Sequence, residues 1–272
     1  MEYNAVNSEK IAGYIVNWLK TYAMNAKVKG FVVGISGGID SALVSTLCAE
    51  TGLPTLCVEM PIHQAESQVS RARSHIAFLK EKYGNVSSMK ADLTAAFDLL
   101  TQTLPEIDDT ALLHLTLANT RARLRMTTLY YFAGTHKALV VGTGNKVEDF
   151  GVGFYTKYGD GGVDISPIAD LMKSEVRILA SYLGVSETIV QAKPTDGLFG
   201  DDRSDEDQLG ASYDELEAAM RAFEQGKSEA DFAGRNLEVF KIYRRLNRAN
   251  QHKMQPIPVC EIPDDIRYQD IK

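Results

Sequence analysis

Cysteine is scarce in this chain. The 272 residues include only three, Cys48, Cys57 and Cys260, and none is spaced as a metal-binding pair. Scattered cysteines of this kind are typical of reduced thiols rather than of a disulfide framework. There is no run of about 18 apolar residues to span a membrane, and no basic region followed by an apolar run at the start. We therefore expect a cytoplasmic protein with no membrane partner.

Basic residues are outnumbered: 29 Lys and Arg face 36 Asp and Glu, for a formal net charge of -7. An acidic balance argues against a nucleic-acid partner. Internal repeats, low-complexity segments and separate linkers are also missing. Because a chain of this length can bury a large core, we interpret residues 1–272 as one domain.

Short apolar runs alternate with segments of helical periodicity along the chain. This alternation predicts a parallel sheet covered by helices, with ligands bound at the carboxyl ends of the strands. The last residues carry three prolines, and we expect them to lie extended over the surface. The expected strands are residues 30–33, 55–60, 86–89 and 138–142, and the clearest expected helices are residues 8–25 (with Ser8 as the N-cap), 66–82 and 111–136.

A glycine-rich turn joins the first strand to the next helix. Glycines let the backbone approach an anion closely, and a helix start presents free N–H groups to it. This is not a Walker loop, because Asp40 stands where that motif has a lysine. An acid beside a phosphate implies an intervening cation, which we expect to be Mg²⁺; the alternative is an ordinary glycine turn. The turn consists of Gly34, Ile35, Ser36, Gly37, Gly38, Ile39, Asp40 and Ser41.

The helix expected at residues 111–136 is apolar on two sides. One stripe contains Ala118, Ala122 and Leu129, and a second, on roughly the opposite side, contains Leu117 and Leu124. One stripe should face the sheet. The other predicts a homodimer formed through this helix, and the alternative is a helix covered by the chain's own C-terminal half.

The same helix carries three arginines. Arg121 and Arg125 project together, whereas Arg123 points about 200° away at 100° per residue. Arg123 is thus set apart, although a solvated surface charge is the other interpretation.

Two later segments suit a binding site. Residues 151–164 are rich in glycine and charge, too irregular for a helix or strand, and such loops often hold binding residues. Residues 193–207 become strongly acidic, and we interpret them either as a mobile lid or as a solvated linker.

Taken together, these motifs resemble a known family. Residues 36–41 resemble the signature of ATP pyrophosphatases, which cut ATP between the α and β phosphates. Residues 156–164 are more specific and resemble ammonia-dependent NAD synthetase, as do further motifs that run in family order from about residue 8 to residue 258. These further motifs are residues 119–126, Gly142 and Thr143 with Glu148, Lys173, Thr195, residues 209–213, and His252 with Lys253.

The resemblance implies a fold and a reaction. The fold is α/β, a Rossmann-like doubly wound parallel sheet of about five strands, as in adenine nucleotide hydrolases. The implied enzyme is a ligase in which ATP adenylates the nicotinate carboxylate of deamido-NAD and ammonia then gives NAD and AMP. Free ammonia is the expected nitrogen donor, because 272 residues leave no room for the amidase domain of glutamine-dependent relatives; the alternative is a separate glutaminase subunit.

The resemblance also implies roles for individual residues. Asp40, Lys173 and Asp160 are expected to be catalytic, with Asp160 helping to deprotonate ammonium. Asp40 and Glu148 match the Mg²⁺ ligands. ATP-binding positions match Gly34 to Ser41 together with Thr143, Lys173 and Thr195, and deamido-NAD-binding positions match Arg123, Lys157, Asp164, His252 and Lys253.

One departure from the family pattern bears on the metal site. Glu148 and Lys157 are nine positions apart, one more than in many members, so the loop carries an extra residue near residues 151–153. Two rival functions stay open: a tRNA-thiolating ligase, which would need a reactive cysteine and a basic surface, and a nucleotide sensor that has lost the chemistry. Retention of Asp40, Glu148 and Lys173 argues against the sensor.

Overall fold

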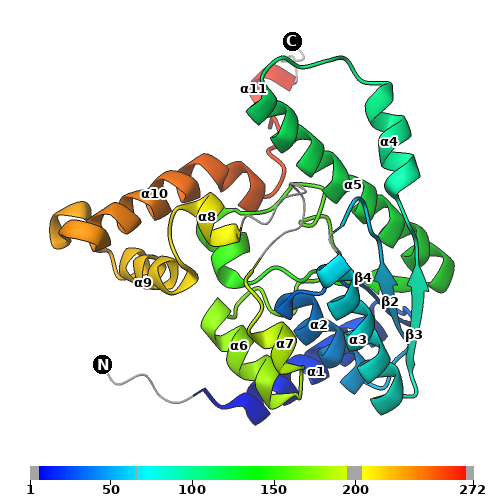
Figure 1. The fold of residues 1–272 in the computed structure, drawn as a ribbon. Coiled ribbons are helices and arrows are strands. Elements are labelled where there is room, and N and C mark those ends of the chain that lie inside the picture. The colour runs from blue at the N-terminus through cyan, green and yellow to red at the C-terminus, as the bar shows by residue number, and fades with distance from the viewer. Residues whose placement is uncertain (1–5, 65, 195–203, 268–272) are drawn as a thin grey trace.

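The computed structural model describes residues 6–64, 66–194 and 204–267 of the 272-residue chain (Figure 1). No helix within these ranges is both long and apolar enough to cross a membrane. The elements are, in chain order, α1 (Ser8–Asn25), β1 (Gly30–Gly34), α2 (Ile39–Glu50), β2 (Thr55–Glu59), α3 (Glu66–Lys82), β3 (Val86–Lys90), α4 (Thr94–Gln102), α5 (Thr110–His136), β4 (Ala138–Val140), the π-helix η1 (Val147–Val152), α6 (Lys173–Tyr182), α7 (Glu187–Val190), α8 (Asp205–Leu209), α9 (Tyr213–Glu224), the short 3-10 helix η2 (Glu229–Asp231), α10 (Gly234–Met254) and α11 (Asp264–Arg267).

The strands form a parallel sheet with the order β3-β2-β1-β4, which confirms the predicted fold class. The described chain has four strands where about five were expected. A fifth strand is reduced to one parallel bridge between Val141 and Ile165. Pro167 follows two residues later and has no N–H to donate to a neighbouring strand, which explains why the pairing stops there.

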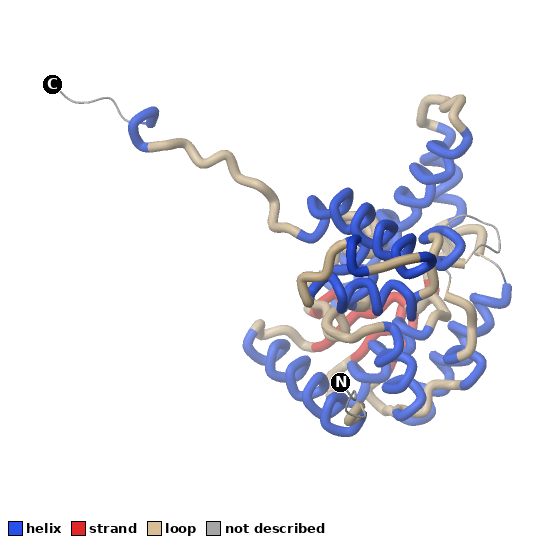
Figure 2. The backbone as a smooth tube through the Cα atoms, turned by 90° about the vertical axis from the view of Figure 1, so that its left-hand side faces the viewer, coloured by secondary structure: helices blue, strands red, loops and turns tan. Residues whose placement is uncertain are grey.

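Helices cover both faces of the sheet, because successive strand residues point to opposite sides. Phe31, Val33 and Cys57 pack with α1, α2, α3 and α6 in one cluster, whereas Val32 and Val58 pack with α5 in another. The strands therefore lie between two helical layers (Figure 2). The site lies at the carboxyl edge of this sheet, as the parallel topology predicts.

A smaller core joins α9 and α10 to η1. It is built around the fully buried Tyr213, Phe240 and Tyr243. The prediction of an irregular segment is wrong for the start of residues 151–164, since Gly151 and Val152 belong to η1. A π-helix holds more residues per turn than an α-helix, so it accommodates the extra residue that the family pattern places here.

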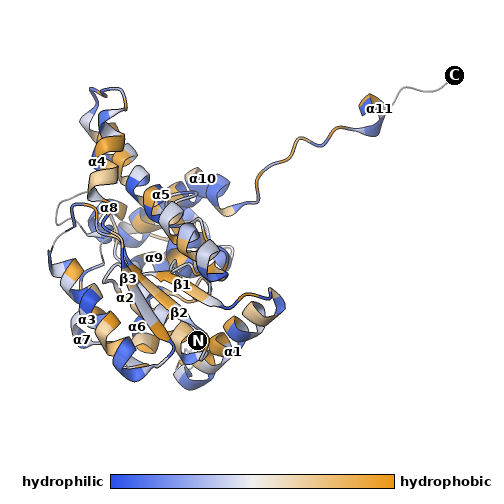
Figure 3. Ribbon diagram, turned by 90° about the vertical axis from the view of Figure 1, so that its right-hand side faces the viewer, coloured by the Kyte–Doolittle hydropathy of each residue, from blue (hydrophilic) through white to orange (hydrophobic). Residues whose placement is uncertain are grey.

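The long helix α5 packs its first apolar stripe on the sheet. Ala118 and Ala122 are buried, and Leu129 packs against the core beneath β1 and β4. The second stripe is only partly covered, because Leu117 and Leu124 are half-buried. Helix α5 and the preceding α4, which the sequence did not predict, protrude from the body (Figures 1 and 3).

Two local predictions are wrong. Asn7, not Ser8, caps α1, because its side chain accepts the backbone N–H of Lys10 at 3.1 Å. Asp205 and Asp207 belong to the helix α8 instead of an acidic loop, with Asp205 buried. Residues 195–203 of this segment lie outside the described residues.

The C-terminal segment also differs from the prediction. Instead of lying over the surface, residues 255–267 extend away from the body (Figures 2 and 3). Ile257 and Val259 are 67% and 79% exposed. Three prolines keep the segment extended by fixing φ and removing donors.

Candidate active site

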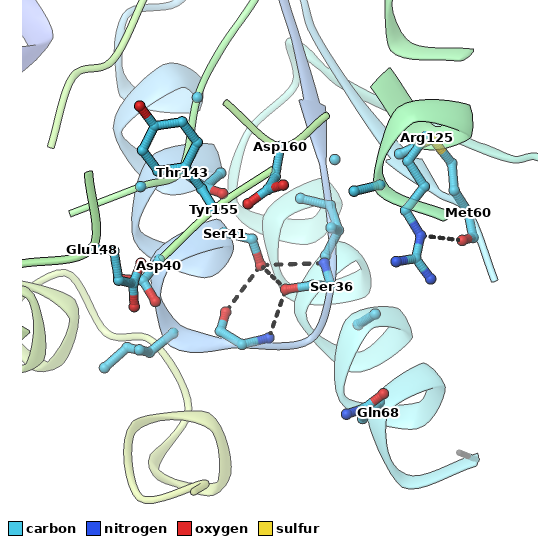
Figure 4. Close-up of a pocket in the computed structure, with 18 of the residues that line it drawn as sticks. Ser36, Asp40, Ser41, Met60, Gln68, Arg125, Thr143, Glu148, Tyr155 and Asp160 are labelled. Atoms are coloured by element: carbon cyan, nitrogen blue, oxygen red, sulfur yellow. Dashed lines mark hydrogen bonds between the residues drawn. The ribbon is translucent and has the colours of Figure 1, made fainter. Parts of the chain in front are cut away.

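The predicted phosphate loop is the turn between β1 and α2, and its own hydroxyls hold it in shape. Ser36 Oγ and Ser41 Oγ lie 3.1 Å apart, and Ser36 Oγ also accepts the N–H of Gly38 at 3.2 Å. Ser41 Oγ donates to the Gly38 carbonyl at 3.0 Å (Figure 4). The N-terminal N–H groups of α2 start directly after Gly38, so a preformed loop and a helix terminus share one place.

Gly37 at the tip of the loop cannot carry a side chain. Its φ is +83°, in the left-handed region, and a Cβ there would lie 2.5 Å from the carbonyl oxygen of Gln68. Helix α3 therefore touches the loop at this residue, and the loop and α3 form one wall of the pocket.

A buried ion cluster lies beside the loop. Lys173 Nζ donates to Asp40 Oδ2 at 2.6 Å and to Glu148 Oε1 at 3.0 Å. Asn145 Nδ2 donates to the other Asp40 oxygen at 3.2 Å, and the Tyr213 hydroxyl donates to Glu148. Burial alone would lower the pKa of Lys173, but the two carboxylates outweigh it and raise the pKa above its ordinary value.

The same carboxylates fit a divalent cation. Both lie within 3.0 Å of one atom, Lys173 Nζ, so their oxygens converge on one point. Mg²⁺ is commonly held by one or two carboxylates, with phosphate oxygens and water as the other ligands. Within the described ranges no three His, Cys, Asp or Glu side chains form a complete metal site. Asp40 and Glu148 therefore suit a metal that arrives with a phosphate substrate.

A pocket opens over the loop and runs between α3 and α5. It contains most of the residues predicted to bind ATP, as well as the predicted base Asp160. Gly37 does not line it, and Thr195 lies outside the described residues. The predicted residues that line the pocket are Gly34, Ile35, Ser36, Gly38, Ile39, Asp40, Ser41, Thr143, Glu148, Asp160 and Lys173.

A further acidic residue of the pocket, Asp149, was not predicted from the sequence. Asp149 lines the pocket, and burial, followed by the charges of Glu148, Asp160 and Asp40, raises its pKa to about 8. Asp160 is held by the backbone N–H of Thr156, which donates to Oδ1 at 2.9 Å. The pocket is thus acidic on the side of η1 and the glycine-rich segment that follows it.

The residues predicted to bind deamido-NAD lie outside the pocket lining. Arg123, Lys157 and His252 are neighbours: Arg123 Nη2 donates to the Lys157 carbonyl at 3.3 Å, and Lys157 Nζ to the His252 carbonyl at 2.6 Å. Lys253 Nζ donates to two backbone carbonyls at 2.8 Å each. Asp164 is separate from this group and accepts from Val140 N at 2.8 Å and from a tyrosine hydroxyl at 3.0 Å.

Two arginines of the pocket were missed. Arg125 donates to the Met60 carbonyl at 3.0 Å and to Gln64 at 2.8 Å (Figure 4). Arg71 donates to the Gly37 carbonyl at 3.2 Å. The helical projection did separate Arg125 from Arg123, which is exposed. Arg71 had no comparable signal, because its neighbour in space lies 34 residues away in sequence.

Comparison with known proteins identifies the family of the chain. The NAD synthase family model matches residues 11–257. The chain is 36% identical over 260 residues to an NH(3)-dependent NAD(+) synthetase of Carboxydothermus hydrogenoformans, covering 95% of this chain and 98% of the relative.

Solved structures agree in fold as well. NMN synthetase from Francisella tularensis matches with a TM-score of 0.81 and 30% identity, and NH3-dependent NAD synthetase from Campylobacter jejuni with 0.76 and 25%. Each comparison covers 94% of this chain and 100% of the other. With a glycine-rich phosphate loop and a carboxylate–lysine cluster in one pocket, the chain belongs to the NAD synthase family.

Proposed function

We propose that this chain uses the pocket over the phosphate loop to amidate deamido-NAD with ammonia at the expense of ATP. The enzyme is a ligase that forms a C–N bond, and the products are NAD, AMP and pyrophosphate. The observation that carries the proposal is the contact of Lys173 with both Asp40 and Glu148 at the side of the loop. That arrangement supplies fixed charge of both signs where a triphosphate would lie.

The chemistry needs two steps. A carboxylate oxygen of the nicotinate forms a bond to the α phosphorus, and the bond from that phosphorus to the bridging oxygen breaks, so pyrophosphate leaves with the electron pair. Ammonia then attacks the carboxyl carbon and AMP leaves. Three anions must come together in the first step, and the main task of the protein is therefore positioning and charge neutralisation.

Each part of the site has a role in this scheme. The loop N–H groups and the hydroxyls of Ser36 and Ser41 bind the departing pyrophosphate. Lys173 neutralises phosphate charge, and Asp160 accepts the proton that ammonium loses. Asp40 and Glu148 would hold Mg²⁺, which when bound supplies further positive charge to the phosphates. Thr143 lines the pocket, and we expect it to contact ATP.

A second candidate function differs in the acceptor, which is the carboxylate substrate that is amidated. The Francisella tularensis structure, at a TM-score of 0.81, is named NMN synthetase. In this chain Lys157 and Lys253 donate to the chain's own carbonyls instead of projecting unpartnered into the pocket. The name of that structure makes nicotinate mononucleotide a second candidate acceptor.

One assay separates these functions. Pure protein is incubated with ATP, MgCl₂ and ammonium, and with either deamido-NAD or nicotinate mononucleotide, and kcat/KM is compared. AMP and pyrophosphate with a preference for deamido-NAD support the proposal, whereas a preference for the mononucleotide supports the second candidate. ADP as the nucleotide product would contradict both.

The quaternary structure is also a proposal. The second stripe of α5 is only partly covered, and Leu112, Leu115 and Tyr131 are 51%, 51% and 67% exposed on this helix. We propose that a second copy covers α5 in a homodimer. Light scattering at micromolar concentration tests this, and a single 30.0 kDa species would contradict it. The single domain and the cytoplasmic location stay predictions.

A further inference from the structure

Arg71 lies on α3 beside the tip of the phosphate loop. Its Nε donates to the carbonyl of Gly37 at 3.2 Å, and its side chain lines the pocket. The backbone of α3 touches the loop at the same point, because a Cβ on Gly37 would lie 2.5 Å from the Gln68 carbonyl and 3.4 Å from the Arg71 Cβ. Gln68 lies across from Ser36 in Figure 4, which places this part of α3 beside the loop. The position of the guanidinium is therefore tied to the position of the loop.

The other basic residues of the pocket lining are placed differently. Lys173 lies between two carboxylates, and Arg125 donates to the Met60 carbonyl and to Gln64. Lys193 is exposed. Lys173 and Arg125 thus already contact groups of the protein itself.

Arg71 differs from them. No carboxylate lies within 4.0 Å of its guanidinium in the described parts of the chain, whereas its neighbour Arg73 is paired with Glu59 and Glu66 at 3.6 Å each. A guanidinium has five N–H donors, and the contact with Gly37 uses one. Arg71 is therefore a half-buried cation, fixed against the loop, with donors left for an anion.

The phosphate loop needs such a cation. From Gly34 to Ser41 it contains no lysine or arginine, and its one charged residue is Asp40. The adjacent cluster of Lys173 with two carboxylates carries a formal charge of −1. Backbone N–H groups contribute only partial charges, so a guanidinium at the loop would add a full positive charge to that of the proposed Mg²⁺.

We propose that Arg71 binds the departing pyrophosphate of ATP and stabilises its developing charge. The proposal rests on the proposed function for the bond that is cut: the bond from the α phosphorus to the bridging oxygen breaks, and the electron pair remains on pyrophosphate. Arg71 donates to non-bridging oxygens of that group and transfers no proton. Its bond to the Gly37 carbonyl keeps the guanidinium at the loop, so the charge is in place before the reaction.

A purely structural tether between α3 and the loop is the competing role of Arg71. The two roles differ in their dependence on the ligand. A tether would affect every nucleotide that occupies the pocket, whereas the proposed contact acts only on ligands that carry β and γ phosphates. AMP and pyrophosphate therefore separate the two roles.

The test compares Arg71→Ala and Arg71→Lys with Arg73→Ala, a matched control on the same helix that does not line the pocket. Calorimetric titration with pyrophosphate, and separately with AMP, is done in MgCl₂. Because a hydrogen bond to a charged group contributes about 1.5–3 kcal/mol, we expect Arg71→Ala to raise the pyrophosphate Kd roughly 10- to 150-fold. Arg71→Lys should recover part of this loss, while AMP binding and the Arg73→Ala protein stay unchanged.

Two results would overturn the proposal. One is normal pyrophosphate binding by both Arg71 variants, and the other is an equal loss of AMP and pyrophosphate binding. If Arg71→Ala does not fold, as judged by its melting temperature, Arg71→Lys decides, because it keeps the aliphatic stem and loses the planar donors.

The result of the Arg71 test does not depend on which acceptor the enzyme amidates. If the wild-type protein makes neither NAD nor NMN but binds pyrophosphate through Arg71, the proposed function fails, while the assignment of Arg71 to a pyrophosphate site stands. If NAD forms but the Arg71 variants bind pyrophosphate normally, the inference fails and the proposed function stands.

Discussion

Replacing Lys173 by methionine tests the central cluster of the site. The substitution keeps the length of the side chain and removes its charge. Lys173 Nζ contacts Asp40 at 2.6 Å and Glu148 at 3.0 Å, and its side chain is only 3% exposed. Without the ammonium, two half-buried carboxylates face one another with no cation between them.

The expected loss of stability is large. Breaking a buried ion pair by removing one partner costs about 3–5 kcal/mol. For a chain of this size, each kcal/mol lowers the melting temperature by about 2–4 °C, so we expect a drop of roughly 6–20 °C in EDTA. Lys146→Met is the matched control, because Lys146 is 26% exposed and its acidic partners lie at 3.4 and 3.7 Å. A surface pair of that kind contributes at most about 1 kcal/mol.

The assay is thermal unfolding in EDTA and in millimolar MgCl₂. If Asp40 and Glu148 form a cation site, Mg²⁺ should restore more stability to Lys173→Met than to the wild-type protein. The double variant Glu148→Gln with Lys173→Met should lose less stability than Lys173→Met alone, because it removes one of the two carboxylates that repel each other. A Lys173→Met protein that melts within about 2 °C of wild type in EDTA would refute the reasoning.

Three further predictions follow from buried groups and from the loop. Burial lowers the pKa of His75 to about 4, so below about pH 6.5 the unfolded chain binds a proton that the folded protein does not bind. The free energy of unfolding should therefore fall by about 3 kcal/mol from pH 6.5 to pH 4. In urea unfolding, His75→Gln should flatten this pH dependence. Gly37→Ala should abolish pyrophosphate binding and destabilise the fold by more than Gly52→Ala, because both glycines have positive φ but only Gly37 has a carbonyl 2.5 Å from an added Cβ; equal melting temperatures for the two variants would contradict this. Asp40→Asn should lower turnover by a factor of 100 or more, on the order of 3 kcal/mol in barrier, with a smaller effect on melting, and near-normal activity would exclude Asp40 as a metal ligand.

Much of the fold could be predicted from the sequence because its signals are local. The β1 run, the glycine turn and the start of α2 are adjacent in the chain, and alternation of strands with helices fixes a parallel sheet. Helix α3 was predicted with the bounds that the structure shows, because its periodicity is clear. Helix α8 was missed, since a short helix of five residues has too few periods to show a pattern.

The site also has features that the sequence predicts and features that it does not. Asp40 could be singled out because an acid in a phosphate loop is chemically unexpected, and Lys173 and Glu148 came from the family resemblance. Their meeting at one point could not be derived from spacing, because Lys173 lies 133 residues from Asp40 and 25 from Glu148. Contacts of this kind depend on how α6, η1 and α2 pack around the sheet.

The sequence by itself determined the parallel α/β architecture and the phosphate loop, since each depends on residue types at fixed local spacing, and its motifs indicated the class of reaction through the family resemblance. Only the tertiary structure placed Arg71 against Gly37, and only it put Asp149 in a buried acidic environment that raises its pKa to about 8. The physical reason is that charge, burial and hydrogen bonding at a site are properties of neighbours in space. Those neighbours are fixed when the helices pack on the sheet, and the periodicity of the sequence does not reveal them.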